Sequence, residues 1–205
     1  MANTNAPFGF RQWSGTGSAP TYEQVAVQLQ YNATNIFFGD PVVALTDGTY
    51  TQASSNSAAN GIGGIFVGCQ YLSVAQKRTV WSNYWPGSDA NGDVDAYVID
   101  DPNARFLVQS SGAAPRATSL STYGTTPVGK YCQFTIGTGS TANGISGAYV
   151  SSLGTTVTFP FIVVDLQTFP PGQNGTDPTT QYYNVVVGFN NEMWRTNGAG
   201  PTGIS

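Results

Sequence analysis

The sequence predicts an all-β protein, either a single β-sandwich or a jelly-roll-like barrel, with an extended N-terminal arm and long loops. Many short segments alternate apolar and polar residues with a period of two, as half-buried strands do. Turn-forming residues separate these segments, and the chain has 25 glycines and 12 prolines. No long stretch has the apolar spacing and caps of an α-helix, and only a short helical turn is expected at 144–150.

The first residues, 1–21, are expected to form the arm, and residues 22–205 a single all-β domain without internal repeats. The arm is rich in glycine, proline and small polar residues, and its aromatic residues are isolated. Leaving such rings in water forgoes about 1.5–3 kcal/mol each. The arm therefore either lies back on its own domain or docks on a partner. The candidate partner-binding residues are Phe8, Phe10, Arg11 and Trp13.

The domain is expected to begin with a strand over 25–31, where valine, leucine and tyrosine alternate with alanine and glutamine. Apolar runs at 36–38 and 42–45 indicate two further strands. Asp47 and Gly48 follow, and an Asp-Gly pair between apolar runs is a strong hairpin signal. The reason is that a type I′ turn needs φ > 0 at both central positions.

The same alternation continues to the end of the chain. Strands are expected at 62–71, 79–85, 94–99, 105–109, 131–136, 156–166 and 183–189. In the strand over 79–85, Trp81 and Trp85 are expected on one face. The run 161–164 is apolar on both faces, which indicates a central strand. The long connections 111–128 and 168–180 are expected to be binding or contact loops.

The composition provides few groups for chemistry. Charged residues make up 9% of the chain, there is no histidine, and the formal net charge is −4. The seven lysines and arginines form no basic stripe, so nucleic acid is not an expected partner. Without histidine a serine or cysteine nucleophile lacks its usual base, so no enzymatic activity, catalytic residue or cofactor is expected. No apolar stretch has membrane-spanning length and no secretion signal is visible, so no membrane partner is expected.

The two cysteines, Cys69 and Cys132, each lie in a strand-like run. Buried free thiols are the expectation. A disulfide between them is the alternative, which requires Cα atoms roughly 4.4–6.8 Å apart.

The densest group of carboxylates lies between Asp89 and Asp101. Its oxygen-bearing side chains partly match the spacing of a calcium-binding loop. The glycine of this segment is misplaced for such a loop and its flanks resemble strands, so an Asn-Gly turn entering an edge strand is expected and calcium is the alternative. The candidate metal ligands are Asp89, Asn91, Asp93, Asp95 and Asp100. The adjacent pair Asp100 and Asp101 is poorly arranged for glycoside hydrolysis, because neighbours in a strand point to opposite faces.

A group of large aromatic residues has two interpretations. As a sugar-stacking platform these rings would lie exposed and coplanar. As core or interface residues they would be buried, and this second interpretation is favoured because tyrosine and tryptophan are also enriched in protein contacts. The residues are Trp81, Tyr84, Trp85 and Trp194.

Six short motifs, in order along the chain, together resemble a known family. They are Asn5–Arg11, Ile36–Val42, Gly63–Cys69, Tyr84–Pro86, Ala96–Pro102 and Gly144–Ala148. In this order they are similar to the cement or decoration proteins, small structural proteins encoded beside the major capsid protein in many tailed bacteriophages. Each motif is short and turn-like, so the order carries the resemblance. The loop at 168–180 does not match the pattern.

The resemblance implies a virion protein, made in the host cytoplasm, on the outer surface of an icosahedral head. Such a protein binds the major capsid protein and stabilises contacts between its subunits. Members of the family are commonly homotrimers, and the family has no catalytic residues to transfer. The alternative is a carbohydrate-binding, lectin-like β-sandwich module on the virion. Exposed coplanar tryptophans would favour this alternative, and burial of Trp81 and Trp85 would argue against it.

Overall fold

The computed structural model describes residues 2–14, 24–30, 32–54, 61–112 and 127–193. Within these residues the chain is all-β, with 14 strands and no helix. The strands form open antiparallel sheets consistent with a β-sandwich, so the predicted fold class is confirmed and the closed-barrel alternative is wrong. No described segment is a helix long and apolar enough to cross a membrane.

The first sheet has six strands, and every pairing between them is antiparallel. Its order is β1 (Arg11–Ser14), β10 (Arg105–Gln109), β14 (Asn184–Phe189), β13 (Phe161–Leu166), β11 (Tyr131–Thr135) and β12 (Tyr149–Gly154). β13, which carries the doubly apolar run, lies inside the sheet between β14 and β11, as its pattern predicts. The helical turn expected at 144–150 is wrong, because β12 begins at Tyr149 and pairs with β11.

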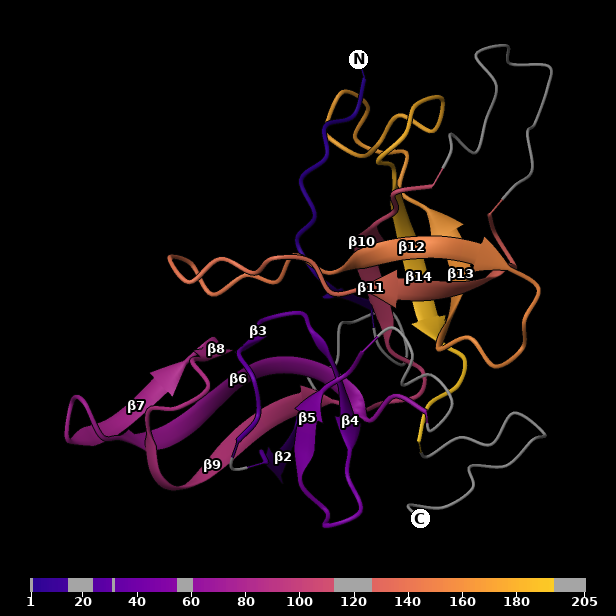
Figure 1. The fold of residues 1–205 in the computed structure, drawn as a ribbon. Helices are drawn as coiled ribbons and strands as arrows, with labels where there is room; N and C mark the ends of the chain where they lie inside the picture. Colours follow the sequence, from indigo (N-terminus) through magenta and orange to yellow (C-terminus); the bar gives the residue numbers. More distant parts are fainter. Residues whose placement is uncertain (1, 15–23, 31, 55–60, 113–126, 194–205) are drawn as a thin grey trace.

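The second sheet is built on two long strands that extend beyond the first sheet (Figure 1). Its order is β2 (Val25–Gln28), β9 (Ala90–Ile99), β6 (Gly64–Ser73), β4 (Pro41–Ala44) and β5 (Tyr50–Gln52). The far end of β6 pairs with β7 (Arg78–Ser82). A separate pair joins β3 (Ile36–Phe37) to β8 (Tyr84–Trp85).

The predicted strand over 79–85 is divided at Asn83, so it forms two strands with different partners. β7 pairs with β6, whereas β8 leaves that sheet and pairs with β3. Trp81 and Trp85 therefore do not share a face, since Trp81 is exposed and Trp85 is buried. The hairpin predicted at Asp47 and Gly48 forms between β4 and β5, but only Gly48 has a positive φ, so the turn is not type I′.

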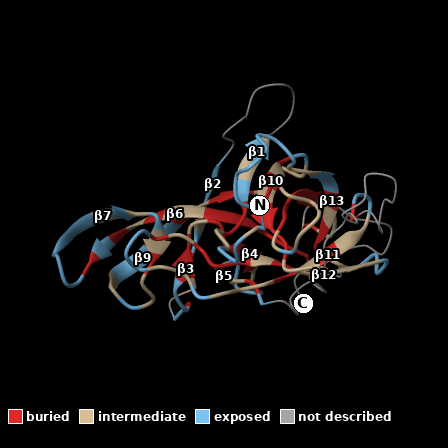
Figure 2. Cartoon of the chain, turned by 90° about the horizontal axis from the view of Figure 1, so that it is seen from above, coloured by how far each residue is buried: buried red, intermediate tan, exposed pale blue. Residues whose placement is uncertain are grey.

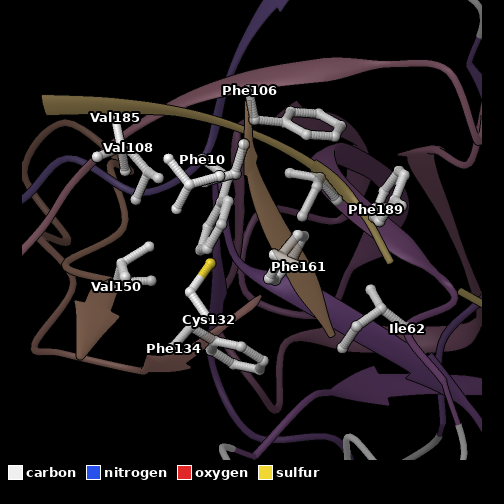
Figure 3. Packing of buried hydrophobic residues seen from close by; sticks show 14 of the residues in the cluster. Phe10, Ile62, Phe106, Val108, Cys132, Phe134, Val150, Phe161, Val185 and Phe189 are labelled. Atoms are coloured by element: carbon white, nitrogen blue, oxygen red, sulfur yellow. The ribbon is translucent and has the colours of Figure 1, made fainter. Parts of the chain in front are cut away.

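The main hydrophobic core lies between the two sheets (Figure 3). The first sheet contributes most of it, including Phe106, Phe161 and Val187. A second core lies on the opposite face of the second sheet, where the β3–β8 pair covers it with Ile36 and Trp85. Figure 2 shows the buried residues concentrated where the sheets meet, whereas much of β7 and the distal part of β9 is exposed.

Residues that are adjacent in a strand of the second sheet belong to different hydrophobic cores. Val42, Phe66 and Val98 belong to the second core, and the adjacent Val43, Ile65 and Ile99 belong to the main core. Alternation across a strand explains this division. The two cysteines also belong to different cores, Cys69 to the second core and Cys132 to the main core. Both are free thiols.

Candidate functional site

The N-terminal segment is held along its length by the rest of the chain. Asn3 is the first anchor: its side-chain amide donates to the carbonyl oxygen of Asp177 over 2.8 Å, and its side-chain oxygen accepts from the Gly175 amide over 2.9 Å. The buried side chain of Gln109 then accepts a hydrogen bond from the amide of Ala6 over 2.9 Å. Figure 1 shows the segment running beside the connection between β13 and β14.

Phe10 is a core residue, with only 1% of its surface exposed. Its ring stacks on Phe161 with 4.6 Å between centroids and meets Phe134 edge-on at 6.1 Å (Figure 3). Its amide donates to the carbonyl oxygen of Gly39 over 2.9 Å. The expectation that Phe10 binds a partner is therefore wrong. The boundary expected at residue 21 is also wrong for the segment up to Ser14, because β1 is part of the first sheet.

The other three candidates of the arm remain at the surface. Arg11 is exposed, Trp13 is 49% exposed, and Phe8 is half-buried. The Arg11 guanidinium lies 5.0 Å from the centroid of the Phe8 ring, a cation–π contact that covers this ring. These three residues, called the N-terminal surface below, lie on and just before β1, the end strand of the first sheet.

A buried carboxylate, Asp40, connects the segment between β11 and β12 to strands β3 and β5. One of its oxygens accepts the Phe37 amide and the side-chain amide of Gln52, each over 2.8 Å, and the other accepts the hydroxyl of Ser146. Burial raises the pKa of Asp40, although these three hydrogen bonds act in the opposite direction. Only 1% of Asp40 is exposed, so the group is a structural junction rather than an accessible acid.

The six motifs of the family resemblance meet around this junction. Phe10 of the first motif bonds to Gly39, and the Phe66 amide of the third donates to the carbonyl oxygen of Asp40 over 2.9 Å. Ser146 of the last motif bonds to the Asp40 carboxylate. The remaining two motifs join through strand pairing, because β8 pairs with β3 and β9 pairs with β6. Motifs that are scattered along the sequence therefore form one contiguous centre.

The acidic stretch does not form a calcium loop, because most of it is strand β9. At about 3.3 Å per residue, the 11 steps from Asp89 to Asp100 along it span up to roughly 36 Å, far more than one coordination sphere. No three acidic, cysteine or histidine side chains of the described residues are grouped to hold a metal. β9 also lies between β2 and β6, so the expected edge strand is wrong.

Asp89, the first of these carboxylates, closes the turn between β6 and β7 instead. It accepts hydrogen bonds from the Ser73 hydroxyl and, over 2.9 Å, from the Ala75 amide. These bonds lower the pKa of Asp89, with Ser73 the larger cause. The residues Asn91–Asp93 lie where the register between β6 and β9 shifts, which places the predicted Asn-Gly feature in a bulge.

The four candidate aromatic residues separate into different environments. Trp85 is 2% exposed and donates its indole N–H to the carbonyl oxygen of Ala33 over 3.3 Å. Tyr84 stacks on Phe37 at 5.5 Å. Trp194 lies outside the described residues. The coplanar platform of four rings is therefore not formed, and of the described residues in the group only Trp81 is largely exposed, at 67%.

The aromatic neighbour of Trp81 is Tyr97, which sequence reasoning missed. Their rings stack with 5.6 Å between centroids and 10° between planes. Tyr97 is on β9 and Trp81 on β7, and β6 separates the two strands in the sheet. The period-two pattern places each ring on a face of its own strand, but no local signal shows that the two strands share a sheet.

Comparisons with known proteins found no match. No family model matches the chain, and neither does any curated protein or solved structure.

Proposed function

We propose that this chain is a structural virion protein, a capsid cement or decoration protein that binds the outer surface of a phage head. Its partners are the major capsid protein and further copies of itself, in a homotrimer. The observation that carries the proposal is the convergence of the six motifs on the Asp40 junction. Because motifs in the family's order form one structural centre, the resemblance covers the framework of the fold rather than unrelated surface turns.

The N-terminal surface is the part of the chain that we assign to the capsid. Arg11 and Trp13 present a guanidinium and an indole on an end strand, and both side chains are enriched in protein interfaces. Phe8 is already held under Arg11, so this region needs little ordering when it binds. Three copies in a trimer gain affinity through effective concentration, even when each contact is weak.

The test uses purified heads of the phage that encodes the chain. The intact protein is incubated with heads lacking it, sedimented, and its ratio to the major capsid protein is measured. A ratio near one to one supports a protein that covers the lattice, and absence from the pellet contradicts the proposal. A few copies per particle would indicate a vertex or fibre protein and would likewise contradict it.

Point variants test the N-terminal surface, because a deletion of this segment would also remove Phe10, which is part of the core. The double variant Arg11→Ala with Trp13→Ala is expected to lower the occupancy at least about tenfold at limiting protein, a change of about 1.4 kcal/mol. The matched control is Trp81→Ala, which removes an exposed tryptophan from the other sheet and leaves occupancy unchanged. Equal occupancy for the double variant and the intact chain would show that the N-terminal surface does not contact the head.

A further inference from the structure

Trp81 and Tyr97 form one wall of an open hollow on the face of the second sheet that carries the main core, where β6, β7 and β9 extend beyond the first sheet (Figure 1). The hollow has a volume of about 380 Å³. Its lining includes Gln24, Gly68, Trp81, Ser82, Asn83 and Tyr97. This size falls within the usual range for small-molecule sites, roughly 300–1,000 Å³.

The stacked pair is fixed before any ligand arrives. Tyr97 is half-buried, and its hydroxyl donates to the side-chain oxygen of Gln70 over 3.3 Å. Trp81 is paired with Gln70 across the sheet, so one polar side chain lies beside both rings. At the rim, the Asn83 side chain donates to the carbonyl oxygen of Asn143 over 2.6 Å, which orients its amide. Rigid aromatic and amide groups lose little conformational freedom on binding.

The chemistry of this hollow matches a sugar ring. The face of an indole is electron-rich, and the C–H groups on one face of a pyranose ring carry a partial positive charge that this face attracts. Amide and hydroxyl groups such as those of Gln24, Ser82 and Asn83 can donate to and accept from sugar hydroxyls. Trp81, at 67% exposure, leaves much of its surface free for such stacking.

The lack of charged side chains in the described lining of the hollow favours neutral sugars over acidic ones. The lining residues that the structure describes are all uncharged. An acidic sugar or a nucleic-acid backbone would leave its negative charge without a cationic partner there. A neutral pyranose needs no such partner.

The surroundings favour a small ligand over a protein. Residues that share this face of the sheet by strand register are polar or small, including Ala26, Gln28, Gln70, Thr79 and Asp95. The larger apolar residues there are Leu72, on the same face, and Val67, which lines the hollow. The centre of a protein interface is usually more apolar than this, whereas a sugar site needs only one or two rings with a polar rim.

We propose that the Trp81–Tyr97 hollow binds a neutral pyranose unit of a glycan by stacking on Trp81. This site is separate from the N-terminal surface, so the protein has one surface for its head and another for carbohydrate. The site does not depend on the proposed capsid function.

The experiment measures binding of the intact protein to soluble neutral oligosaccharides by calorimetry. The probes are β-1,4-linked glucose, α-1,4-linked glucose, β-1,4-linked mannose and β-1,4-linked N-acetylglucosamine oligomers. We expect at least one to bind with a submillimolar dissociation constant. Trp81→Ala is expected to weaken that binding at least about tenfold, and Trp81→Phe to weaken it less, because it keeps a ring.

The controls distinguish binding at this site from nonspecific binding and from misfolding of the variants. Trp13→Ala removes the other described tryptophan with high exposure and is expected to bind the oligosaccharide as the intact chain does. Thermal unfolding shows that the Trp81 variants remain folded. The proposal is overturned if none of the probes binds, if Trp81→Ala binds as well as the intact chain, or if sialyllactose or an oligothymidylate binds more tightly than every neutral probe. Occupancy on heads is measured in parallel, so loss of one activity is distinguished from loss of the other.

Discussion

The hydroxyl of Ser146 donates a hydrogen bond to the buried carboxylate of Asp40, 106 positions away in the chain. This contact joins the connection between β11 and β12 to the start of β4. Because Ser146 also accepts the Ala148 amide over 2.8 Å, the pair fixes the backbone on both sides of the junction.

Removing the carboxylate is expected to destabilise the fold strongly. Asp40→Ala leaves the Phe37 amide and the Ser146 hydroxyl without their acceptor, and each unsatisfied buried group costs about 1–3 kcal/mol. The Gln52 side chain also loses a hydrogen bond, but it still donates to the carbonyl oxygen of Asn35 over 3.1 Å. We expect a loss of at least about 2 kcal/mol in the free energy of unfolding, measured by urea denaturation. The control Asp93→Ala changes an exposed carboxylate and is expected to stay within about 0.5 kcal/mol. Equal losses for the two variants would contradict the role of Asp40.

The raised pKa of Asp40 predicts a pH dependence with a definite sign. Burial raises the pKa of Asp40 above the ordinary aspartate value of 3.8, so the folded state binds this proton more tightly than the unfolded state. The stability from this group is fully present below pH 3.8 and is lost as the pH rises through the folded pKa. The difference in unfolding free energy between the intact chain and Asp40→Asn should therefore shift in favour of the intact chain as the pH falls. A flat difference, or one that shifts the other way, would exclude this linkage.

Gly9 is expected to tolerate no side chain. Its φ is +74°, and a Cβ there would lie 2.7 Å from the Ser146 Cβ and 3.0 Å from the Gly39 carbonyl oxygen. Gly48 is a matched control, because its φ of +82° is similar but nothing lies within 4 Å of its Cβ position. Gly48→Ala thus measures backbone strain alone, about 1–2 kcal/mol. Gly9→Ala is expected to cost at least about 1 kcal/mol more by urea denaturation, because overpacking adds to that strain. Similar costs would mean that the junction can relax.

Both cysteines are expected to be unreactive in the folded protein. Burial raises the pKa of Cys69 to about 12, and burial also raises the pKa of Cys132, so neither is a thiolate at pH 8. A thiol reagent such as Ellman's should therefore modify neither in buffer and both in denaturant. Their separate cores also predict that an oxidant forms no disulfide between them without unfolding. Rapid modification of either thiol in buffer would contradict the burial described here.

Local patterns predicted the strands whose pairing is regular. β10 lies at the predicted residues and β14 begins one residue later than predicted, because each has continuous alternation and a neighbour on both sides. The strand over 79–85 was predicted without its break, since the alternation continues through Asn83. Only the change of partner from β6 to β3 shows that the chain turns there.

The long-range contacts of the candidate sites were not predictable. The sequence leaves open whether Phe10 packs on its own domain or on a partner, because its partners, Phe134 and Phe161, are distant in sequence. The stack of Trp81 on Tyr97 depends on the order of three strands, which no single segment encodes. Asn91 and Gly92 have turn propensity, but the pairing of Ala90 and Val94 with β6 holds this part of the chain within β9, where a bulge accommodates them.

The position of Phe10 in the core also has a consequence for the order of folding during synthesis. Its stacking partner Phe161 is made 151 residues later (161 − 10), and Phe161 in turn stacks on Phe189. At roughly 5–20 residues per second, translation takes about 8–30 s to proceed from Phe10 to Phe161, and until then Phe10 has no stacking partner. Phe10 is therefore translated long before it can be packed, and the nascent chain carries this aromatic residue unburied until β13 and β14 emerge.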